Sequence, residues 1–384
     1  MMPIYCDHNA TTPLRAEVLA AMLPFLREHY GNASSVHAYG AHARGAIEDA
    51  RTEVAALIGA PPAEVVFTSG GTESNNLAIH GVARAAAPGA IVTSAIEHAS
   101  VRESAAALER DGYCLCTVGV DKLGRVLTSE LEALLANGAV NLVSIGWANN
   151  EVGTIQSIGG ISTQCRLHGV LLHVDAVQAA GKIPVHVTGI DLLSLSAHKL
   201  GGPQGVGALY VRTGVELRPL LFGGHQERER RAGTENVAGI VGMGMACRLA
   251  AAELGTFAAC AALRERLWAG LSERITGVVR NSPTEAECLP NTLNVSFDEV
   301  RGEALVAALD LQGVAVSGGS ACAAGAGEPS HVLMALGRSA EAARDGVRFS
   351  LGRTTTLAEV EHVIVITAAA VQRIRGAHRE RRRA

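Results

Sequence analysis

Lysine is scarce in this sequence. Only Lys122, Lys182 and Lys199 occur among its 384 residues, although lysine and arginine together number 33. Chemistry that needs an uncharged side-chain amine therefore has three candidates. Aromatic residues are also few, at 3% of the chain, so we expect a core built mainly from alanine, valine and leucine.

The chain also lacks features typical of several other protein classes. No uninterrupted apolar stretch approaches the roughly 20 residues of a membrane-spanning helix, and no charged segment followed by an apolar core opens the sequence. The eight cysteines include no CxxC pair, which argues against a zinc site or a disulfide framework. A formal charge of -4 leaves no basic excess for nucleic-acid phosphates. We expect a cytoplasmic protein without a membrane or nucleic-acid partner.

Strand-like and helical patterns alternate along the first two thirds of the chain. Continuously apolar runs predict strands at 64–68, 90–95, 113–118, 141–147, 170–175, 192–196 and 207–211. Helical periodicity predicts helices at 15–29, 40–58, 76–86, 99–109, 129–135, 159–167 and 236–253. This alternation indicates an α/β fold whose mostly parallel sheet is covered on both faces.

The last third of the chain has a different pattern. Strands are expected at 293–297 and 347–350, and helices at 302–309 and 357–374. The length favours two domains. We expect a large domain of residues 14–255 and a smaller α+β domain that combines residues 1–13 with residues 256–384.

Polar residues follow five of the predicted strands. They occur at 70–72, 97–98, 149–150, 175–178 and 196–199. Each segment alone could be an ordinary polar loop. Because ligands bind at the carboxyl ends of strands in a parallel sheet, the five segments together predict one site.

Lys199 is the lysine best placed for chemistry. It lies in residues 196–202 (SAHKLGG), after a buried strand and beside the donors Ser196 and His198. A lysine there can form a Schiff base with a carbonyl cofactor. Asp175 could pair with the protonated ring nitrogen of pyridoxal phosphate, although an aspartate that caps a turn is an equally good interpretation.

Two further side chains suit the same cofactor. Gln178 could donate to its phenolic oxygen, and His98 could stack on its ring and move protons. A solvated surface histidine is the alternative interpretation of His98. Residues 70–74 (GGTES) place glycines at a helix N-terminus, which favours a phosphate. They lack the lysine of a Walker A loop, and an ordinary N-capped helix after a glycine turn is the alternative.

Cys322 lies within a run of glycine and alanine at 318–327. That backbone freedom suits a thiolate that travels between a substrate and an acceptor better than it suits a packing residue. Arg348 lies in the strand expected at 347–350. Its guanidinium could clamp a substrate carboxylate, and a surface ion pair is the alternative.

Several motifs, in order along the chain, resemble the NifS/IscS-type cysteine desulfurases of the class V aminotransferases. They are residues 7–13 (DHNATTP), 68–76 (TSGGTESNN), 173–178 (HVDAVQ), 196–199 (SAHK), 224–227 (GHQE), 231–236 (RAGTEN) and 317–322 (SGGSAC). The resemblance implies a fold-type I pyridoxal 5'-phosphate enzyme that forms a homodimer with active sites at the subunit interface.

The resemblance also implies a role for each site residue. Lys199 would hold the cofactor as a Schiff base and move the α-proton, and Asp175 would pair with the ring nitrogen. His98 would stack on the cofactor ring, and Gln178 and Asn150 would contact the phenolic oxygen or the substrate. The phosphate would be bound by Gly71, Thr72, Ser196 and His198, joined by Thr234 of the partner subunit. Arg348, helped by Asn150, would bind the substrate carboxylate, and Cys322 would take the sulfur.

The implied activity converts L-cysteine to L-alanine and leaves a persulfide on Cys322, which donates sulfur to an iron–sulfur scaffold or another acceptor protein. No intrinsic metal is implied, although Cys322 could contact a cluster transiently. A selenocysteine lyase, another lyase on the same fold, and a partner-dependent sulfur carrier are the alternatives. The short C-terminus, residues 224–227 and residues 323–325 favour the nitrogen-fixation-type branch.

Overall fold

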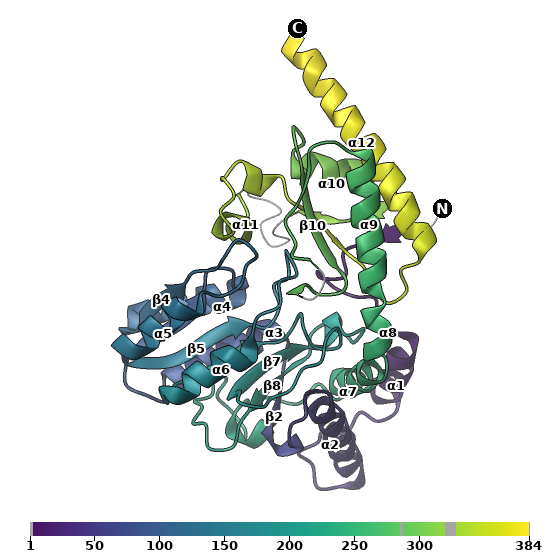
Figure 1. Cartoon of the computed structure of the whole chain (residues 1–384). Helices are drawn as coiled ribbons and strands as arrows, with labels where there is room; N and C mark the ends of the chain where they lie inside the picture. Colours follow the sequence, from purple (N-terminus) through teal and green to yellow (C-terminus); the bar gives the residue numbers. More distant parts are fainter. Residues whose placement is uncertain (1–2, 285–286, 319–327, 384) are drawn as a thin grey trace.

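The computed structural model describes residues 3–284, 287–318 and 328–383. A seven-stranded sheet forms the lower part of the molecule in Figure 1. Its strand order is β2 (Val65–Thr68), β8 (Gly207–Val211), β7 (Leu192–Ser196), β6 (Leu171–Asp175), β5 (Val140–Gly146), β3 (Ala90–Ser94) and β4 (Cys114–Val118). β8 runs antiparallel to both of its neighbours, and the other pairs are parallel. The mostly parallel sheet predicted from the sequence is confirmed.

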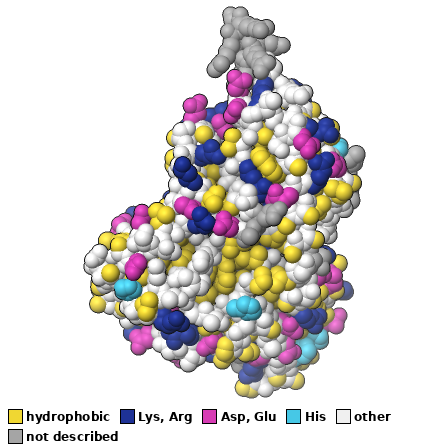
Figure 2. Space-filling model, in the orientation of Figure 1, with side chains coloured by type: hydrophobic (Ala, Val, Ile, Leu, Met, Phe, Trp, Pro, Cys, Tyr) yellow, Lys and Arg dark blue, Asp and Glu magenta, His cyan; other side chains and the backbone are white. Residues whose placement is uncertain are grey.

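A second part of the molecule lies above this sheet in Figure 1. It contains the four-stranded antiparallel sheet β12 (Ser317–Gly318), β13 (Val347–Ser350), β10 (Thr292–Phe297) and β9 (Val278–Arg280), and the parallel pair β1 (Ile4–Tyr5) and β11 (Val314–Ala315). Its helices are α9 (Cys260–Arg274), α10 (Gly302–Asp310), α11 (His331–Ala335) and α12 (Leu357–Arg383). Hydrophobic side chains gather across the middle of the face in Figure 2, where the two parts meet. The domain boundaries expected at 13/14 and 255/256 stay a prediction.

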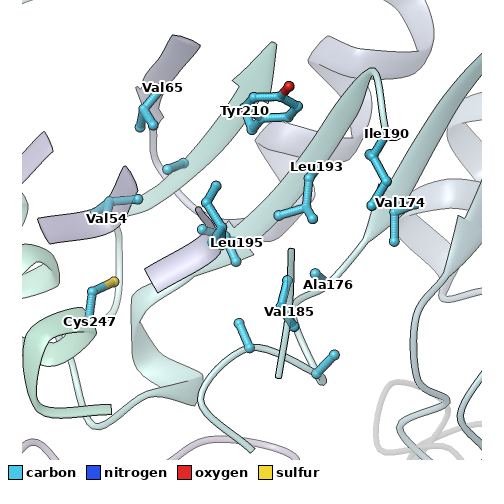
Figure 3. Packing of buried hydrophobic residues seen from close by; sticks show 14 of the residues in the cluster. Val54, Val65, Val174, Ala176, Val185, Ile190, Leu193, Leu195, Tyr210 and Cys247 are labelled. Carbon is cyan, nitrogen blue, oxygen red and sulfur yellow. The ribbon is translucent and has the colours of Figure 1, made fainter. Parts of the chain in front are cut away.

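Helices cover both faces of the large sheet. They are α1 (Ala16–Arg27), α2 (Ala38–Ile58), α3 (Gly71–Ala83), α4 (Ala99–Ala107), α5 (Thr128–Asn137), α6 (Ile158–Leu167) and α7 (Val237–Ala252), after which the short α8 (Leu254–Ala258) leads to α9. Successive strand residues point to opposite faces, so Leu193 joins the core under α2 and α7, and Leu192 joins the core under α3 and α4. Figure 3 shows Leu193 and Leu195 packed among Val54, Val174 and Cys247 in the first of these cores.

Helix α3 begins at Gly71, five residues before the start expected from the sequence. Gly70, with φ 153° and ψ −177°, has a backbone conformation that side chains other than glycine rarely adopt, and it turns the chain from β2 directly into the helix. Glu73 accepts a hydrogen bond from Ser69 N at 2.7 Å and ties this turn to the first helical turn. The earlier start places Gly71 and Thr72 at the helix N-terminus.

Three other features differ from expectation or add to it. Helix α9 and strand β9 were not predicted, and α12 continues to Arg383 instead of ending near residue 374. Within the described residues, no helix is both long and apolar enough to cross a membrane.

Candidate active site

One edge of the large sheet collects the polar segments that follow its strands. β3, β5, β6 and β7 are parallel, and β2 points the same way because both β2 and β7 are antiparallel to β8. The carboxyl ends of these strands therefore meet at one edge. Ser69, His98, Asn150, Asp175 and Lys199 all lie just beyond that edge, so the structure brings together the loops that the sequence singled out.

Lys199 ends a single turn of 3-10 helix (Ala197–Lys199) directly after β7. Its Nζ donates to the main-chain oxygens of Asn9 and Ala10 at 2.6 and 2.7 Å. These contacts place the N-terminal segment over the sheet edge, close to the amine. The neighbouring His198 is held by Thr11, with 3.1 Å between Nδ1 and Oγ1. Burial and the charge of Lys199 lower the pKa of His198 to about 4, so this imidazole is neutral at physiological pH.

A chain of three hydrogen bonds connects Asp175 to His98. Asn75, buried on α3, donates from Nδ2 to Asp175 Oδ2 at 2.7 Å and to Ser100 Oγ at 2.9 Å. Ser100 Oγ in turn lies 2.8 Å from His98 Nδ1. The other Asp175 oxygen accepts from Val177 N at 2.9 Å. The carboxylate is thus fixed in orientation by two donors and keeps lone pairs for a further donor.

His98 is exposed and caps the N-terminus of α4. Its Nδ1 accepts a hydrogen bond from Ser100 N at 3.1 Å. A ring nitrogen that accepts a hydrogen bond carries no proton, so the neutral ring holds its proton on Nε2. The ring nitrogen that can exchange protons with a ligand is therefore Nε2.

Glu97, the residue before His98, is almost fully buried. It accepts from Gly146 N at 2.8 Å and contacts the hydroxyl of Ser94. Burial raises the pKa of Glu97 to about 8, and the charge of Asp175 adds to the increase. Glu97 is therefore a protonated carboxyl at neutral pH.

Arg348 comes to the site from β13. Its side chain is 1% exposed, with Nη2 at 2.6 Å from Asp7 Oδ1 and Nη1 donating to Asn150 O at 2.9 Å. The alternative of a surface ion pair is wrong because the guanidinium is buried. Asn150 contacts Arg348 through its main-chain oxygen, and its expected contact with the cofactor or substrate stays a prediction.

The N-terminus of α3 lies beside Ser196. The first N–H groups of a helix have no acceptor within the helix, and Gly71, the first residue of α3, lies close to Ser196. A Cβ on Gly71 would approach Val177 Cγ2 to 2.8 Å and Ser196 Cβ to 3.6 Å. Free helix N–H groups, an oriented carboxylate and an amine fit the phosphate, ring nitrogen and aldehyde of pyridoxal phosphate.

Lys199 also lines a cavity that lies away from Asp175 and His98. It has a volume of about 350 Å³ and is lined by Thr12, Arg15, Lys182, Lys199 and Glu253, among others. Neither Asp175 nor His98 lines it. It therefore lies along the N-terminal segment and does not reach Asp175 or His98.

Two predicted site residues need separate mention. Thr234 is exposed, and with Ser69 it lines a cavity of about 100 Å³ within its own chain, so its predicted contact with the partner subunit stays a prediction. Cys322 lies outside the described residues. On one side of it, Ser317 pairs with Arg348 across β12 and β13. On the other side, Ser330 donates to Glu151 Oε2 at 2.6 Å. Both described flanks of the Cys322 segment thus lie at the edge of the site.

Comparison with known proteins agrees with this geometry. Residues 4–363 match the model of the family described as aminotransferase class-V. The chain belongs to this family. A cysteine desulfurase IscS of Dictyoglomus turgidum is 46% identical over 377 residues, which cover 97% of this chain and 95% of that protein.

Solved structures show the same relationship. A NifS-like protein superposes with a TM-score of 0.91 at 40% identity and covers 97% of this chain and 100% of its own. A structure described as SspA in complex with cysteine has a TM-score of 0.80 at 34% identity, covering 92% and 100%. The fold is that of the fold-type I enzymes that depend on pyridoxal phosphate, and the chain groups with the cysteine desulfurases of the family.

The sequence did not single out every residue that organises this class V aminotransferase site. Asn9, Asn75, Asp7 and Glu97 all contact predicted site residues or lie directly beside them. Asp7, Asn9 and Asn75 fall within the motifs that carried the resemblance, which was the available signal. Their contacts depend on which segments meet in space, and the motifs do not give that.

Proposed function

We propose that this class V aminotransferase acts as a cysteine desulfurase in which Lys199 and Cys322 are the two nucleophiles. The observation that carries the proposal is the meeting of Lys199, Asp175, His98 and Arg348 at one sheet edge, with the flanks of the Cys322 segment beside them. The relatives named cysteine desulfurase support the choice of L-cysteine as substrate.

Arg348 orients the amino acid. Its guanidinium is buried and paired with Asp7 at 2.6 Å, so the position of the guanidinium is fixed before the substrate binds. A substrate carboxylate takes up the remaining guanidinium N–H capacity in a charge-assisted contact. Because Asn150 O also holds Nη1 at 2.9 Å, the carboxylate position is defined relative to the sheet edge.

Lys199 and His98 move protons. Pyridoxal phosphate, when bound, supplies a carbonyl for amine exchange and a ring that stabilises negative charge on the α-carbon. The Lys199 amine, which donates to the Asn9 and Ala10 oxygens, would be the base for the α-proton. His98 Nε2 exchanges protons with the substrate side chain. Asp175, fixed by Asn75 and Val177 N, keeps the ring nitrogen protonated.

Cys322 takes the sulfur. Its thiolate forms an S–S bond to the substrate sulfur as the substrate C–S bond breaks, and the carbon fragment gains protons and leaves as alanine. The persulfide on Cys322 then passes its outer sulfur to an acceptor protein. An iron–sulfur scaffold is the acceptor favoured by the relatives of the IscS type.

A homodimer fits the exposed surface. Helix α1, the segment after it and the start of α2 expose several large apolar side chains: Leu26 at 60%, Tyr30 at 77%, Val36 at 97% and Tyr39 at 57%. Exposed apolar residues concentrated in one segment are typical of an interface.

The described cysteines are all free thiols, which supports a reducing compartment such as the cytoplasm.

The test is alanine release by the purified, cofactor-loaded protein from L-cysteine with a thiol reductant and no partner protein. Multiple turnovers support the desulfurase. Turnover only on L-selenocysteine would show a selenocysteine lyase, and no turnover until an acceptor protein is added would show a partner-dependent carrier.

A further inference from the structure

Lys182 is a second lysine close to the site, and none of the roles above uses it. Lys182 lies in the turn after β6 and is 4% exposed. A buried lysine is rare unless an anion pairs with it. Within the described part of the chain, no carboxylate lies at ion-pair distance from Lys182. Its contacts are instead two uncharged oxygens.

The amine of Lys182 donates to Gln178 Oε1 at 2.7 Å and to Asn9 Oδ1 at 2.8 Å. Burial lowers the pKa of Lys182 well below its ordinary value, and the charges of Lys199 and Arg348 act in the same direction. Lys182 therefore donates to two amide side chains and connects them.

The first effect of the Lys182 contacts is to fix the orientation of the Gln178 amide. While Oε1 accepts from Lys182, Nε2 donates to Asn9 O at 2.9 Å. A flip of the amide would set Oε1 against the Asn9 oxygen with no proton between them. The two contacts together fix which end of Gln178 carries the N–H groups, and the second Nε2 proton stays available to a cofactor oxygen.

The second effect concerns Asn9, which is 1% exposed. Its main-chain oxygen accepts from both Gln178 Nε2 and Lys199 Nζ. Its side chain accepts from Lys182 and donates to Asn150 O at 3.1 Å and Thr292 Oγ1 at 2.8 Å. Lys182 thus holds the residue whose carbonyl oxygen holds Lys199.

We propose that Lys182 is a positioning residue, whose amine fixes Gln178 and Asn9 and through them the cofactor oxygen donor and the Lys199 amine. The inference rests on the roles proposed for Lys199 and Gln178.

The test compares the absorption maximum of the cofactor-loaded protein in Lys182→Met, Gln178→Leu and the double variant. Lys182→Met should shift the maximum in the same direction as Gln178→Leu. The double variant should shift the maximum by less than the sum of the two single shifts, because Lys182 acts in part through the same amide. The kcat of Lys182→Met should fall by up to about a hundredfold, the cost of a small misplacement of reacting groups, with a smaller change in KM. The matched control is the exposed Lys122: Lys122→Met should leave the spectrum and kcat unchanged.

Lys182→Met holoprotein with the wild-type absorption maximum would overturn the proposal and leave Lys182 a structural residue, whatever the loss of thermal stability. Where Lys182→Met does not fold, Lys182→Gln, whose shorter side chain does not reach both Gln178 and Asn9, carries the same comparison. Reduction of the bound cofactor with borohydride, followed by peptide mapping, tests the attachment of the cofactor to Lys199 separately from the role of Lys182. A label on a lysine other than Lys199 would overturn the proposed function, whereas a label on Lys199 with no spectral shift in Lys182→Met overturns only this inference.

Discussion

Uncharged amides hold the charged side chains of this site. Asn75 orients Asp175, and Asn9 accepts from both Lys199 and Lys182. An amide can donate and accept at once without adding charge. Such a side chain can connect groups of like or opposite charge in a buried setting without changing the balance of charge in the site.

Replacement of Lys199 tests the attachment of the cofactor. Lys199→Ala should lose the absorbance at about 400 nm that a lysine-bound cofactor gives, because Gln178 and Asn9 hold the amine of Lys182 and Lys122 is exposed. Lys122→Ala, at an exposed position, should retain it. A spectrum recorded after reconstitution and gel filtration decides; retention of the band by Lys199→Ala would show that another amine binds the cofactor.

Glu97 should make stability depend on pH. Its pKa is about 8 in the folded protein, against an ordinary value of 4.5. Between these values the folded protein keeps a proton that the unfolded chain has released, so stability falls as pH rises from about 5 to 8. Glu97→Gln, which can keep the Ser94 and Gly146 contacts, should flatten this slope and be more stable at pH 8 by a few kcal/mol.

Denaturant unfolding at several pH values measures this effect. Glu109→Gln, at an exposed position, should keep the wild-type slope. An unchanged slope in Glu97→Gln would mean that Glu97 is ionised in the folded protein.

At the scale of elements, the sequence predicted most strands and helices because their periodicity is local. It also predicted that the segments after the strands would meet, since parallel strands share a carboxyl edge. It missed the start of α3, because a GGTES segment is not periodic and its helical first turn depends on the Gly70 backbone and the Glu73 contact.

Gly70 should be intolerant of substitution although space is available. A Cβ there would meet only Ser196 Oγ, at 3.9 Å, but φ 153° would be strained by about 1–3 kcal/mol. Gly70→Ala should lower stability by that amount and weaken cofactor binding, because the turn sets the N-terminus of α3. Gly159→Ala, in α6 with nothing within 4 Å of its Cβ, should be neutral. Thermal unfolding and cofactor titration of both variants measure the difference, and equal behaviour would contradict the account.

At the scale of the whole molecule, the site depends on contacts between distant segments. Asn9 and Lys199 are 190 residues apart, and Arg348 meets Asp7 across 341. No local pattern encodes such pairs, so the sequence could not predict the contacts of Asp7 and Asn9 or the burial of Arg348. It did place Arg348 in its strand, because that depends on alternation alone.

The proposed dimer predicts that a charge on α1 separates the subunits. Leu26→Glu should shift the protein from dimer to monomer in light scattering, because its exposed apolar side chain would lie in the interface. Leu167→Glu changes a more exposed leucine, 78% exposed, on α6 and should leave the dimer intact. Dissociation by Leu167→Glu, or a dimeric Leu26→Glu protein, would contradict the assigned interface.

The central claim is that sulfur passes from L-cysteine to Cys322 at the edge defined by Lys199. Peptide mass mapping of the cofactor-loaded protein after a brief exposure to L-cysteine tests it most directly. The account predicts one extra sulfur atom on the Cys322 peptide, absent from both Lys199→Ala and Cys322→Ala. A persulfide on another of the eight cysteines, or an undiminished yield in Cys322→Ala, would contradict it.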